Sequence, residues 1–298
     1  MTLIFEPHEF PPPSSTVHIE FGAQTRCGAG HTVNEDHHLI VQLSRHQETL
    51  RSSLSEEVIA KRFDEFGYAM IVADGLGDWG EASSRIALAT LMDLVLHFGK
   101  WNLRIDHDIA QEIMERARRF YRHVDGTMIQ RGLTDHGPGL QTTLTAAFGA
   151  GRDLFFAHVG HSRAYLFRDG QLMRLTRDHT IGRRHSTTTP VAPLVDLNVA
   201  ARDLKHILTE TIGMGGPVGP KIDLERFQLL DLDRVLVCTN GLTDMVDEKV
   251  VAEVLDSDRS PEDHCRTLVD LALAAGGDDD ATALVARFRI PESLERQP

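Results

Sequence analysis

A carboxylate ends a buried apolar run in the stretch from Tyr68 to Gly80. Residues 68–73 are nearly all apolar, as in a strand covered on both faces, and they lead directly into Asp74-Gly75. An ionised carboxylate in that place costs free energy unless a positive charge lies beside it. Gly75 allows a turn that brings a carbonyl oxygen close by. The stretch is therefore either an ordinary Asp-Gly turn or part of a site for a hard cation such as Mg²⁺ or Mn²⁺.

Similar polar junctions recur at the ends of other predicted strands. They are Glu35-Asp36 before a strand at 39–43, Asn240 after a strand at 233–239, and Asp278-Asp279-Asp280 before a strand at 281–288. Each one alone is equally a helix cap or a solvated turn, but strand ends remote in sequence can meet at one edge of a sheet sandwich. Carboxylates gathered without a basic run are best stabilised by two divalent cations. Two ions about 4 Å apart can clamp a phosphoryl group and lower the pKa of a bound water.

The composition limits the classes of partner. The chain has 298 residues with 41% hydrophobic residues, enough for one large domain or two small ones. A formal net charge of −13 argues against a nucleic-acid partner, because a phosphate backbone favours a basic face. Three widely spaced cysteines predict no disulfide framework and favour a reducing compartment. With no membrane-spanning run and no secretory signal, we expect a cytoplasmic protein without a membrane contact.

The chain divides into a lead-in, one main domain and a tail. We expect a flexible lead-in over residues 1–15, a domain over 16–290 and a tail over 291–298. Within the domain, 44–67 is predicted as an inserted loop with at most one short helix, and the long irregular stretch 180–220 as a functional flap. Helices are predicted over 81–100, 105–131 and 261–276, and further strands over 17–21, 141–148, 154–159, 162–167 and 171–175. The last three are expected to be consecutive antiparallel strands, with a hairpin turn at 168–171.

Seven short motifs follow one another in the order of a known family. They are Asn34-Glu35-Asp36, Ala73-Asp74-Gly75-Leu76-Gly77, Gln141-Thr142-Thr143, Val159-Gly160-His161-Ser162-Arg163, Leu175-Thr176-Arg177-Asp178-His179, Cys238-Thr239-Asn240-Gly241-Leu242 and Asp279-Asp280-Ala281-Thr282. The chain resembles the metal-dependent protein phosphatases, the PPM or type-2C family, from about Val17 to Phe288. No single motif is decisive, but seven in order are highly specific.

The resemblance implies a fold, a reaction and cofactors. The expected fold is α+β, a four-layer αββα sandwich with two central antiparallel β-sheets flanked by helices. The expected enzyme is a phosphoprotein phosphatase that hydrolyses phosphoserine and phosphothreonine through a water activated by two Mn²⁺ or Mg²⁺ ions. The expected partners are phosphorylated proteins and, as a further possibility, a serine/threonine kinase, and the chain is expected to be a monomer.

The resemblance also assigns roles to individual residues. Asp74 would bridge the two metals, and the Gly75 carbonyl would hold the first. Asp279 and Asn240 would hold the second. Glu35 and Asp36 would act through metal-bound waters or a neighbouring site. Of these, Asp74, Asp279 and Asp36 are the residues expected to carry catalysis.

Three positions depart from the family pattern. Asn240 and His161 both stand where the family has a metal-binding Asp, and His31 stands where it has a phosphate-contacting Arg. Asn240 can still ligate through its amide oxygen but brings no charge, which should weaken the second metal. The family's third metal site is expected to be absent or rebuilt around His161. His31 is either a protonatable substitute for the arginine or a loop histidine without a role.

These departures leave two functions open. The first is an active phosphatase with a weaker core metal pair, favoured because Asp74, Gly75 and Asp279 remain. The second is a catalytically weak or inactive phosphatase-like module that binds phosphoproteins or a kinase, suggested by the joint change at His31, His161 and Asn240.

Overall fold

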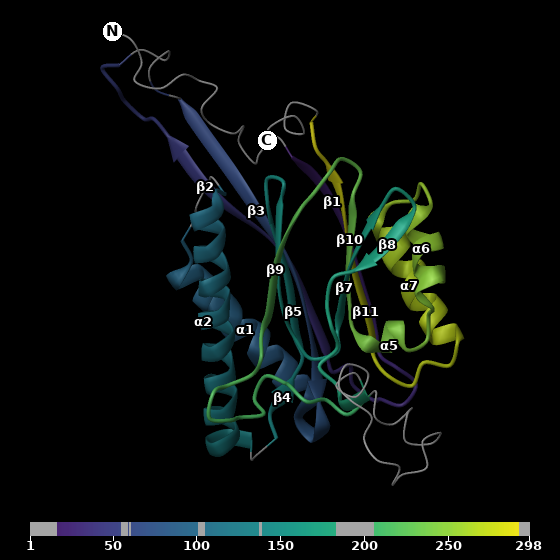
Figure 1. Ribbon diagram of the computed structural model, residues 1–298. Coiled ribbons are helices and arrows are strands. Elements are labelled where there is room, and N and C mark those ends of the chain that lie inside the picture. Colours follow the sequence, from purple (N-terminus) through teal and green to yellow (C-terminus); the bar gives the residue numbers. More distant parts are fainter. Residues whose placement is uncertain are drawn as a thin grey trace.

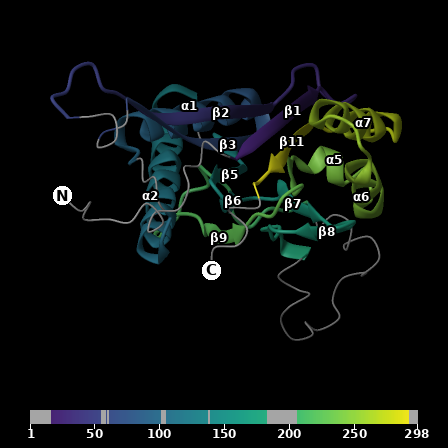
Figure 2. The ribbon, with the colours of Figure 1, turned by 90° about the horizontal axis from the view of Figure 1, so that it is seen from above.

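Two antiparallel β-sheets lie face to face, and helices cover the outer face of each (Figure 1). The computed structural model describes residues 17–54, 59, 61–100, 105–136, 139–182 and 206–291. Seen from above, the order of helix, sheet, sheet and helix is clear (Figure 2). The predicted αββα sandwich is therefore confirmed. The predicted lead-in, and all but the first residue of the predicted tail, lie outside the described residues.

The strands divide between the sheets without following chain order. In spatial order, the first sheet contains β1 (His18–Arg26), β11 (Ala281–Arg289), β10 (Arg234–Cys238), β7 (Arg163–Arg168) and β8 (Gln171–Arg174). The second contains β2 (Asp36–Glu48), β3 (Arg62–Leu76), β5 (Leu144–Ala150), β6 (Asp153–Val159) and β9 (Asp223–Gln228), with the short β4 (Gln141–Thr142) beside β3. The strand predicted from the apolar run is thus β3, which lies inside its sheet between β2 and β5.

Two groups of helices form the outer layers. The β3 sheet is covered by α1 (Gly80–Phe98), which follows the 3₁₀ turn η3 (Gly77–Trp79), and by α2 (His107–Arg131), which ends in the π-helical turn η4 (Gly132–His136). The β11 sheet is covered by α5 (Asn240–Thr243), α6 (Glu248–Asp256) and α7 (Pro261–Ala274). The three predicted helices are α1, α2 and α7. The α7 start is capped as its sequence indicates, since the Ser260 hydroxyl accepts the Asp263 amide at 3.1 Å.

The side-chain alternation of β3 explains its continuous apolar run. Met70 and Val72 point into the core between the sheets, whereas Ala69, Ile71 and Ala73 point toward α1 and α2. Successive side chains on a strand face opposite sides, so a strand buried on both faces must be apolar at every position. The acid that ends this strand therefore emerges from the middle of two hydrophobic layers.

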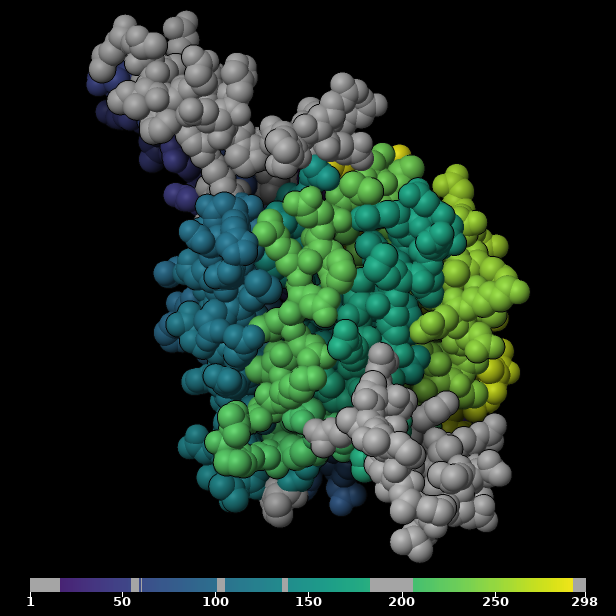
Figure 3. Space-filling model, viewed as in Figure 1, coloured from purple at the N-terminus to yellow at the C-terminus, as the bar shows by residue number. Residues whose placement is uncertain are grey.

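The prediction of an inserted loop over residues 44–67 is wrong at both ends of this range, where the chain forms strands. Strands β2 and β3 pair from Asp36 with Asp74 as far as Glu48 with Arg62, and the Thr49 amide donates to the Lys61 carbonyl at 2.9 Å. The long hairpin projects beyond the rounded body of the molecule (Figures 1 and 3). Its outer half is exposed on β2, so charged and polar residues are tolerated there and conceal the strand pattern.

Other differences arise where the chain changes sheet. The hairpin turn at 168–171 is confirmed, with positive φ at Asp169 and Gly170, but β6 and β7 belong to different sheets rather than to one run of adjacent strands. The chain crosses between them at Gly160, whose φ is +114°. The strand predicted over 141–148 is interrupted at Thr143, and β9 and α6 were not predicted.

The predicted flap at 180–220 is only partly described. Residues 183–205 lie outside the described residues. The two flanks are joined by an isolated bridge between Thr180 and Leu208, and the Thr209 amide donates to the His179 carbonyl at 2.8 Å. The segment from 206 then leads into β9, and the two fill the surface between α2 and the β7–β8 hairpin (Figure 3).

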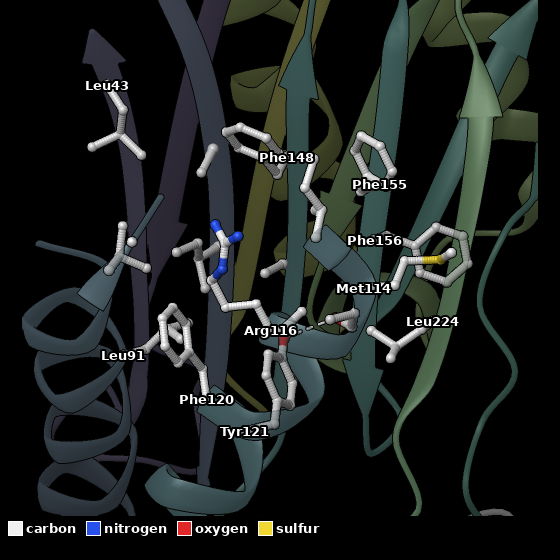
Figure 4. Close-up of a pocket in the computed structure, with 18 of the residues that line it drawn as sticks. Leu43, Leu91, Met114, Arg116, Phe120, Tyr121, Phe148, Phe155, Phe156 and Leu224 are labelled. Atoms are coloured by element: carbon white, nitrogen blue, oxygen red, sulfur yellow. Dashed lines mark hydrogen bonds between the residues drawn. The ribbon is translucent and has the colours of Figure 1, made fainter. Parts of the chain in front are cut away.

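An apolar cavity of about 160 Å³ lies between α2 and the sheet it covers (Figure 4). The polar groups at its wall are already paired. The Tyr121 hydroxyl donates to the Ala157 carbonyl at 2.8 Å, and the Arg116 guanidinium donates to the Lys100 carbonyl at 2.8 Å and to Glu112 at 2.9 Å. The apolar wall therefore offers few hydrogen-bond partners to a water molecule.

Filling this cavity is expected to stabilise the fold. Ala117→Leu on α2 should raise the free energy of unfolding by about 1 kcal/mol, because the added methylenes enter existing space beside Phe120 and Phe155. Urea unfolding followed by circular dichroism measures the change. The same substitution at Ala110, which lies on α2 at 2% exposure away from the cavity, should instead destabilise by overpacking. Equal effects at both positions would contradict the assignment of the cavity.

Candidate active site

The polar strand ends lie together at one edge of the sandwich. Asp36 opens β2 directly opposite Asp74 at the end of β3. The Asp36 carboxylate accepts hydrogen bonds from two hydroxyls on the side of the other sheet, those of Thr239, which follows β10, at 2.8 Å and Thr282 of β11 at 2.7 Å. Asp36 thus ties the two sheets together at this edge. Burial is the main cause that raises its pKa well above the usual range, and the charge of Asp279 adds to the effect.

Asp74 has a fixed backbone and an unpaired carboxylate. Its amide donates to the Thr143 hydroxyl at 3.1 Å, and its carbonyl accepts from the Thr142 hydroxyl at 2.7 Å and the Thr143 amide at 2.9 Å. Its Oδ2 atom is buried and has no hydrogen-bond partner among the described residues. Burial, followed by the charges of Asp36 and Asp279, raises the pKa of Asp74 well above its ordinary value. Without a nearby cation, the ionised form of Asp74 is therefore costly in this site.

Gly75 is required by the close approach of the next helix. A Cβ atom added to Gly75 would lie 1.8 Å from the carbonyl oxygen of Gly80, at the start of α1. The Gly75 amide donates to the Glu35 carbonyl at 3.2 Å, and the Glu35 carboxylate lies against Gly80. Burial raises the pKa of Glu35. The loop before β2 and the turn after β3 are therefore packed directly on each other.

Asn240 lies between two carboxylates. Its Nδ2 donates to Asp279 Oδ2 at 3.0 Å and to Asp244 Oδ2 at 3.3 Å, while its buried Oδ1 has no partner among the described residues. The Asp279 carboxylate also accepts the Asp280 amide at 2.9 Å. An amide can therefore bridge acids that would repel an aspartate in the same place. The amide oxygen remains unused.

Asp280 has a structural environment unlike that of its neighbour. Its carboxylate accepts the amides of Gly28 at 2.8 Å and Glu35 at 2.6 Å and contacts His31 Nδ1 at 3.0 Å. Burial opposes ionisation here, but these hydrogen bonds prevail and lower the pKa of Asp280. Asp280 is committed to holding the 27–35 loop, which leaves Asp279 as the acid of this run that faces Asn240.

His31 has a protein partner that sequence reasoning missed. Its hydrogen bond to Asp280 raises the pKa of the imidazole, and its side chain remains 34% exposed. This favours a protonated ring at the rim of the site. A role for His31 in phosphate binding stays a prediction.

His161 points toward Asp74 without bonding to it. Its Nδ1 lies 3.7 Å from Asp74 Oδ2 and has no hydrogen-bond partner in the described part of the chain. Burial lowers the pKa of this histidine, which favours the neutral ring.

These residues fit a divalent cation. Buried polar atoms are nearly always paired, yet Asp74 Oδ2, Asn240 Oδ1 and His161 Nδ1 are not. All three can donate an electron pair to a metal. Within the described ranges, no three His, Cys, Asp or Glu side chains are grouped closely enough to hold a metal by themselves. An ion here would need the Asn240 amide, a backbone carbonyl such as that of Gly75, or water to complete its ligands, as hard cations commonly do.

A histidine pair below the site positions the crossing between β6 and β7. His179 Nδ1 accepts the Gly160 amide at 3.2 Å, and its Nε2 donates to Asp223 at 3.2 Å. Neighbouring His158 accepts the Thr145 hydroxyl at 2.8 Å and donates to the Arg177 carbonyl at 3.1 Å. Sequence reasoning placed His179 in a motif but gave it no role, and β9, which supplies Asp223, was not predicted.

His158 should make stability depend on pH. Burial lowers the pKa of His158 to about 3, from an ordinary value of 6.5. Between pH 6.5 and pH 3, His158 is therefore protonated in the unfolded chain but not in the folded chain. The free energy of unfolding falls as the pH drops through this range. His158→Gln keeps one donor and one acceptor but cannot titrate. Between pH 7 and pH 5, the free energy of unfolding of this variant should fall by roughly 2 kcal/mol less than that of the parent protein. Urea unfolding at pH 7 and pH 5 measures this difference. Equal losses of stability in the two proteins would contradict the low pKa assigned to His158.

Known proteins are similar to this chain over most of its length. No protein-family model matches the chain. The serine/threonine phosphatase stp of Listeria welshimeri is 30% identical over 219 residues, which cover 72% of this chain and 82% of the relative. PstP of Mycobacterium tuberculosis is 29% identical over 221 residues, 73% of this chain and 40% of that protein.

Solved structures share the fold. A serine/threonine phosphatase of S. agalactiae superposes with a TM-score of 0.72 at 24% identity, covering 92% of this chain and 100% of the other. The catalytic domain of PstP in complex with two manganese ions gives a TM-score of 0.64 at 24% identity, covering 92% and 100%.

Proposed function

Since this chain belongs to the bacterial PPM-type serine/threonine phosphatases, we propose that its strand-end edge binds two divalent cations, Mn²⁺ or Mg²⁺, and hydrolyses phosphoserine and phosphothreonine in proteins. Asp74 and the Gly75 carbonyl would hold the first ion, and Asp74, Asp279 and Asn240 would hold the second. The observation that carries the proposal is the buried, unpartnered Asp74 carboxylate amid other acids. The ionised form of such a group costs free energy unless a cation accompanies it.

The residues of the chain have distinct tasks in this reaction. Bound ions would supply an activated water and offset the negative charge of the phosphoryl group. Asp36 links the two sheets through Thr239 and Thr282. With Glu35 it would act through metal-bound waters or at a neighbouring site. Asp280 fixes the loop that carries His31, whose protonated ring can attract a phosphate at the rim.

The alternative of a non-catalytic binding module has less support. The relatives are named as phosphatases, and Asp74, Gly75 and Asp279 lie at the same edge. The changes at Asn240 and His161 reduce negative charge without removing donor atoms. They favour an altered metal affinity over a lost reaction.

The setting of the enzyme follows from the same proposal. Its substrates are phosphorylated proteins, and a serine/threonine kinase acting on those proteins is its natural counterpart. Cys27, Cys238 and Cys265 are all unpaired, which supports a reducing compartment such as the cytoplasm. Among the described helices, none is long and apolar enough to cross a membrane. We propose a monomer, to be checked by light scattering.

Hydrolysis of a phosphothreonine peptide tests the proposal. The purified chain should release phosphate in the presence of Mn²⁺ and lose this activity in a chelator. Asp74→Ala should reduce the rate by a factor of about 10³ or more, as expected when a group central to transition-state charge is removed. Equal rates for the two proteins would end the proposal.

A further inference from the structure

Two buried donor atoms face each other across the site and neither has a partner. Asp74 Oδ2 and His161 Nδ1 are 3.7 Å apart, and their side chains are 9% and 10% exposed. That separation is too long for a hydrogen bond between them. Both atoms are also without hydrogen bonds to any other described residue.

One metal ion between the two atoms would satisfy both. Bonds from imidazole nitrogen or carboxylate oxygen to an ion such as Zn²⁺ are about 2.0–2.2 Å long. A gap of 3.7 Å is shorter than two such bonds end to end, so a single ion can contact both atoms at a bent angle.

The backbone around His161 is held in place for such a role. Gly160 takes a φ of +114°, and a Cβ atom on it would lie 2.6 Å from the Thr143 side chain. The Gly160 amide donates to His179, and on the other side of His161 the Ser162 hydroxyl pairs with Thr143 at 2.8 Å. Thr143 in turn accepts the Asp74 amide. One threonine therefore links the segments that carry both donor atoms.

We propose that His161 Nδ1 and Asp74 Oδ2 bind one and the same divalent transition-metal ion, so that this site prefers Mn²⁺, Co²⁺ or Zn²⁺ to Mg²⁺. Imidazole suits Zn²⁺ and Co²⁺ well and Mn²⁺ least among these three ions, whereas Mg²⁺ takes oxygen ligands and gives up its waters reluctantly. The inference rests on the proposed function, because it assigns a nitrogen ligand to the same metal site. It also explains how a histidine can stand at a buried position beside an aspartate without a hydrogen bond.

Pulsed electron paramagnetic resonance of the Mn²⁺-loaded full chain tests the ligand directly. The parent protein should show nitrogen coupling to Mn²⁺ that changes when its histidines carry ¹⁵N, a comparison that needs no substitution. The coupling should disappear in His161→Ala and in His161→Asp. His46→Ala, on the projecting hairpin, controls for adventitious histidine binding and should keep it. Coupling that persists in both His161 variants would overturn the proposal.

Calorimetry with the metals alone provides the second measurement. His161→Ala should weaken Mn²⁺ and Co²⁺ binding about tenfold or more, since loss of even an outer partner costs 10- to 100-fold. Mg²⁺ binding should change by less than about threefold, because an oxygen-seeking ion gains little from the ring. His161→Asp should restore Mn²⁺ affinity and reduce the preference over Mg²⁺. An unchanged ratio of Mn²⁺ to Mg²⁺ affinity in both variants would overturn the inference.

The outcomes separate this inference from the proposed function. If Mn²⁺ binds, is lost in Asp74→Ala and shows no nitrogen coupling, only the role of His161 is wrong. If the parent protein binds no divalent ion at millimolar concentration, both the inference and the proposed function fail.

Discussion

Asp74→Asn is expected to stabilise the metal-free protein while it removes Mn²⁺-dependent hydrolysis. Asp74 is 6% exposed as a residue, lacks a partner at Oδ2 and lies among the charges of Asp36, Asp279 and Asp280. Its ionised form is therefore costly when no cation is bound. Asparagine has nearly the same volume and no charge, so the free energy of unfolding in a chelator should rise by about 1–3 kcal/mol.

Mn²⁺ should reverse the order of stability. Added Mn²⁺ stabilises the parent protein by mass action because it binds the folded state, whereas the variant should gain little. Urea unfolding in chelator and in millimolar Mn²⁺ gives the free energy of unfolding of each protein without and with the metal. Phosphopeptide hydrolysis gives the activity.

A matched control uses an acid that has a partner. Asp153 is 8% exposed and burial raises its pKa, but its carboxylate accepts the Arg226 guanidinium at 2.7 Å. Asp153→Asn should therefore destabilise the protein under both conditions. A metal-free Asp74→Asn protein less stable than the parent would show that the carboxylate is satisfied without a cation.

The sequence contained enough to predict where the site lies. A strand buried on both faces is apolar at every position, and its end is marked by the first charge, as at Asp74. The uncharged Asn240 after β10 and the acids before β11 were found in the same way, as polar residues bordering a buried apolar run. These strand ends meet because the two sheets form a sandwich, in which β2 and β3 of one sheet share an edge with β10 and β11 of the other.

The sequence could not show which partner each polar group has. Asp279 and Asp280 are chemically identical neighbours, yet one faces Asn240 and the other is held by two amides and His31. That difference depends on the path of the 27–35 loop, which has no periodic pattern. The outer β2–β3 hairpin escaped prediction for a related reason, since strands without a buried face have no apolar alternation to reveal them.

Asn240→Asp is expected to change metal-free stability and Mn²⁺ affinity in the directions opposite to Asp74→Asn. The Asn240 amide now donates to both Asp279 and Asp244. An aspartate would lose these two hydrogen bonds and add a charge beside existing ones, so the metal-free protein should become less stable by about 1–3 kcal/mol. With a cation present the added charge is attractive, because one more carboxylate faces the ion. Mn²⁺ should bind about tenfold tighter, a gain of about 1.4 kcal/mol, and hydrolysis at low Mn²⁺ should increase.

A negative charge added far from the site should change neither Mn²⁺ affinity nor metal-free stability. Gln171→Glu adds one negative charge in the exposed β7–β8 hairpin and should leave Mn²⁺ affinity and metal-free stability nearly unchanged. Calorimetry with Mn²⁺ and unfolding in chelator compare the three proteins. Unchanged metal affinity in Asn240→Asp would mean that Asn240 is not a ligand. If instead Asp74→Asn and Asn240→Asp move stability and metal affinity in opposite directions, the charge at this edge sets the balance, and Asn240 moderates repulsion in the metal-free fold at the expense of cation affinity.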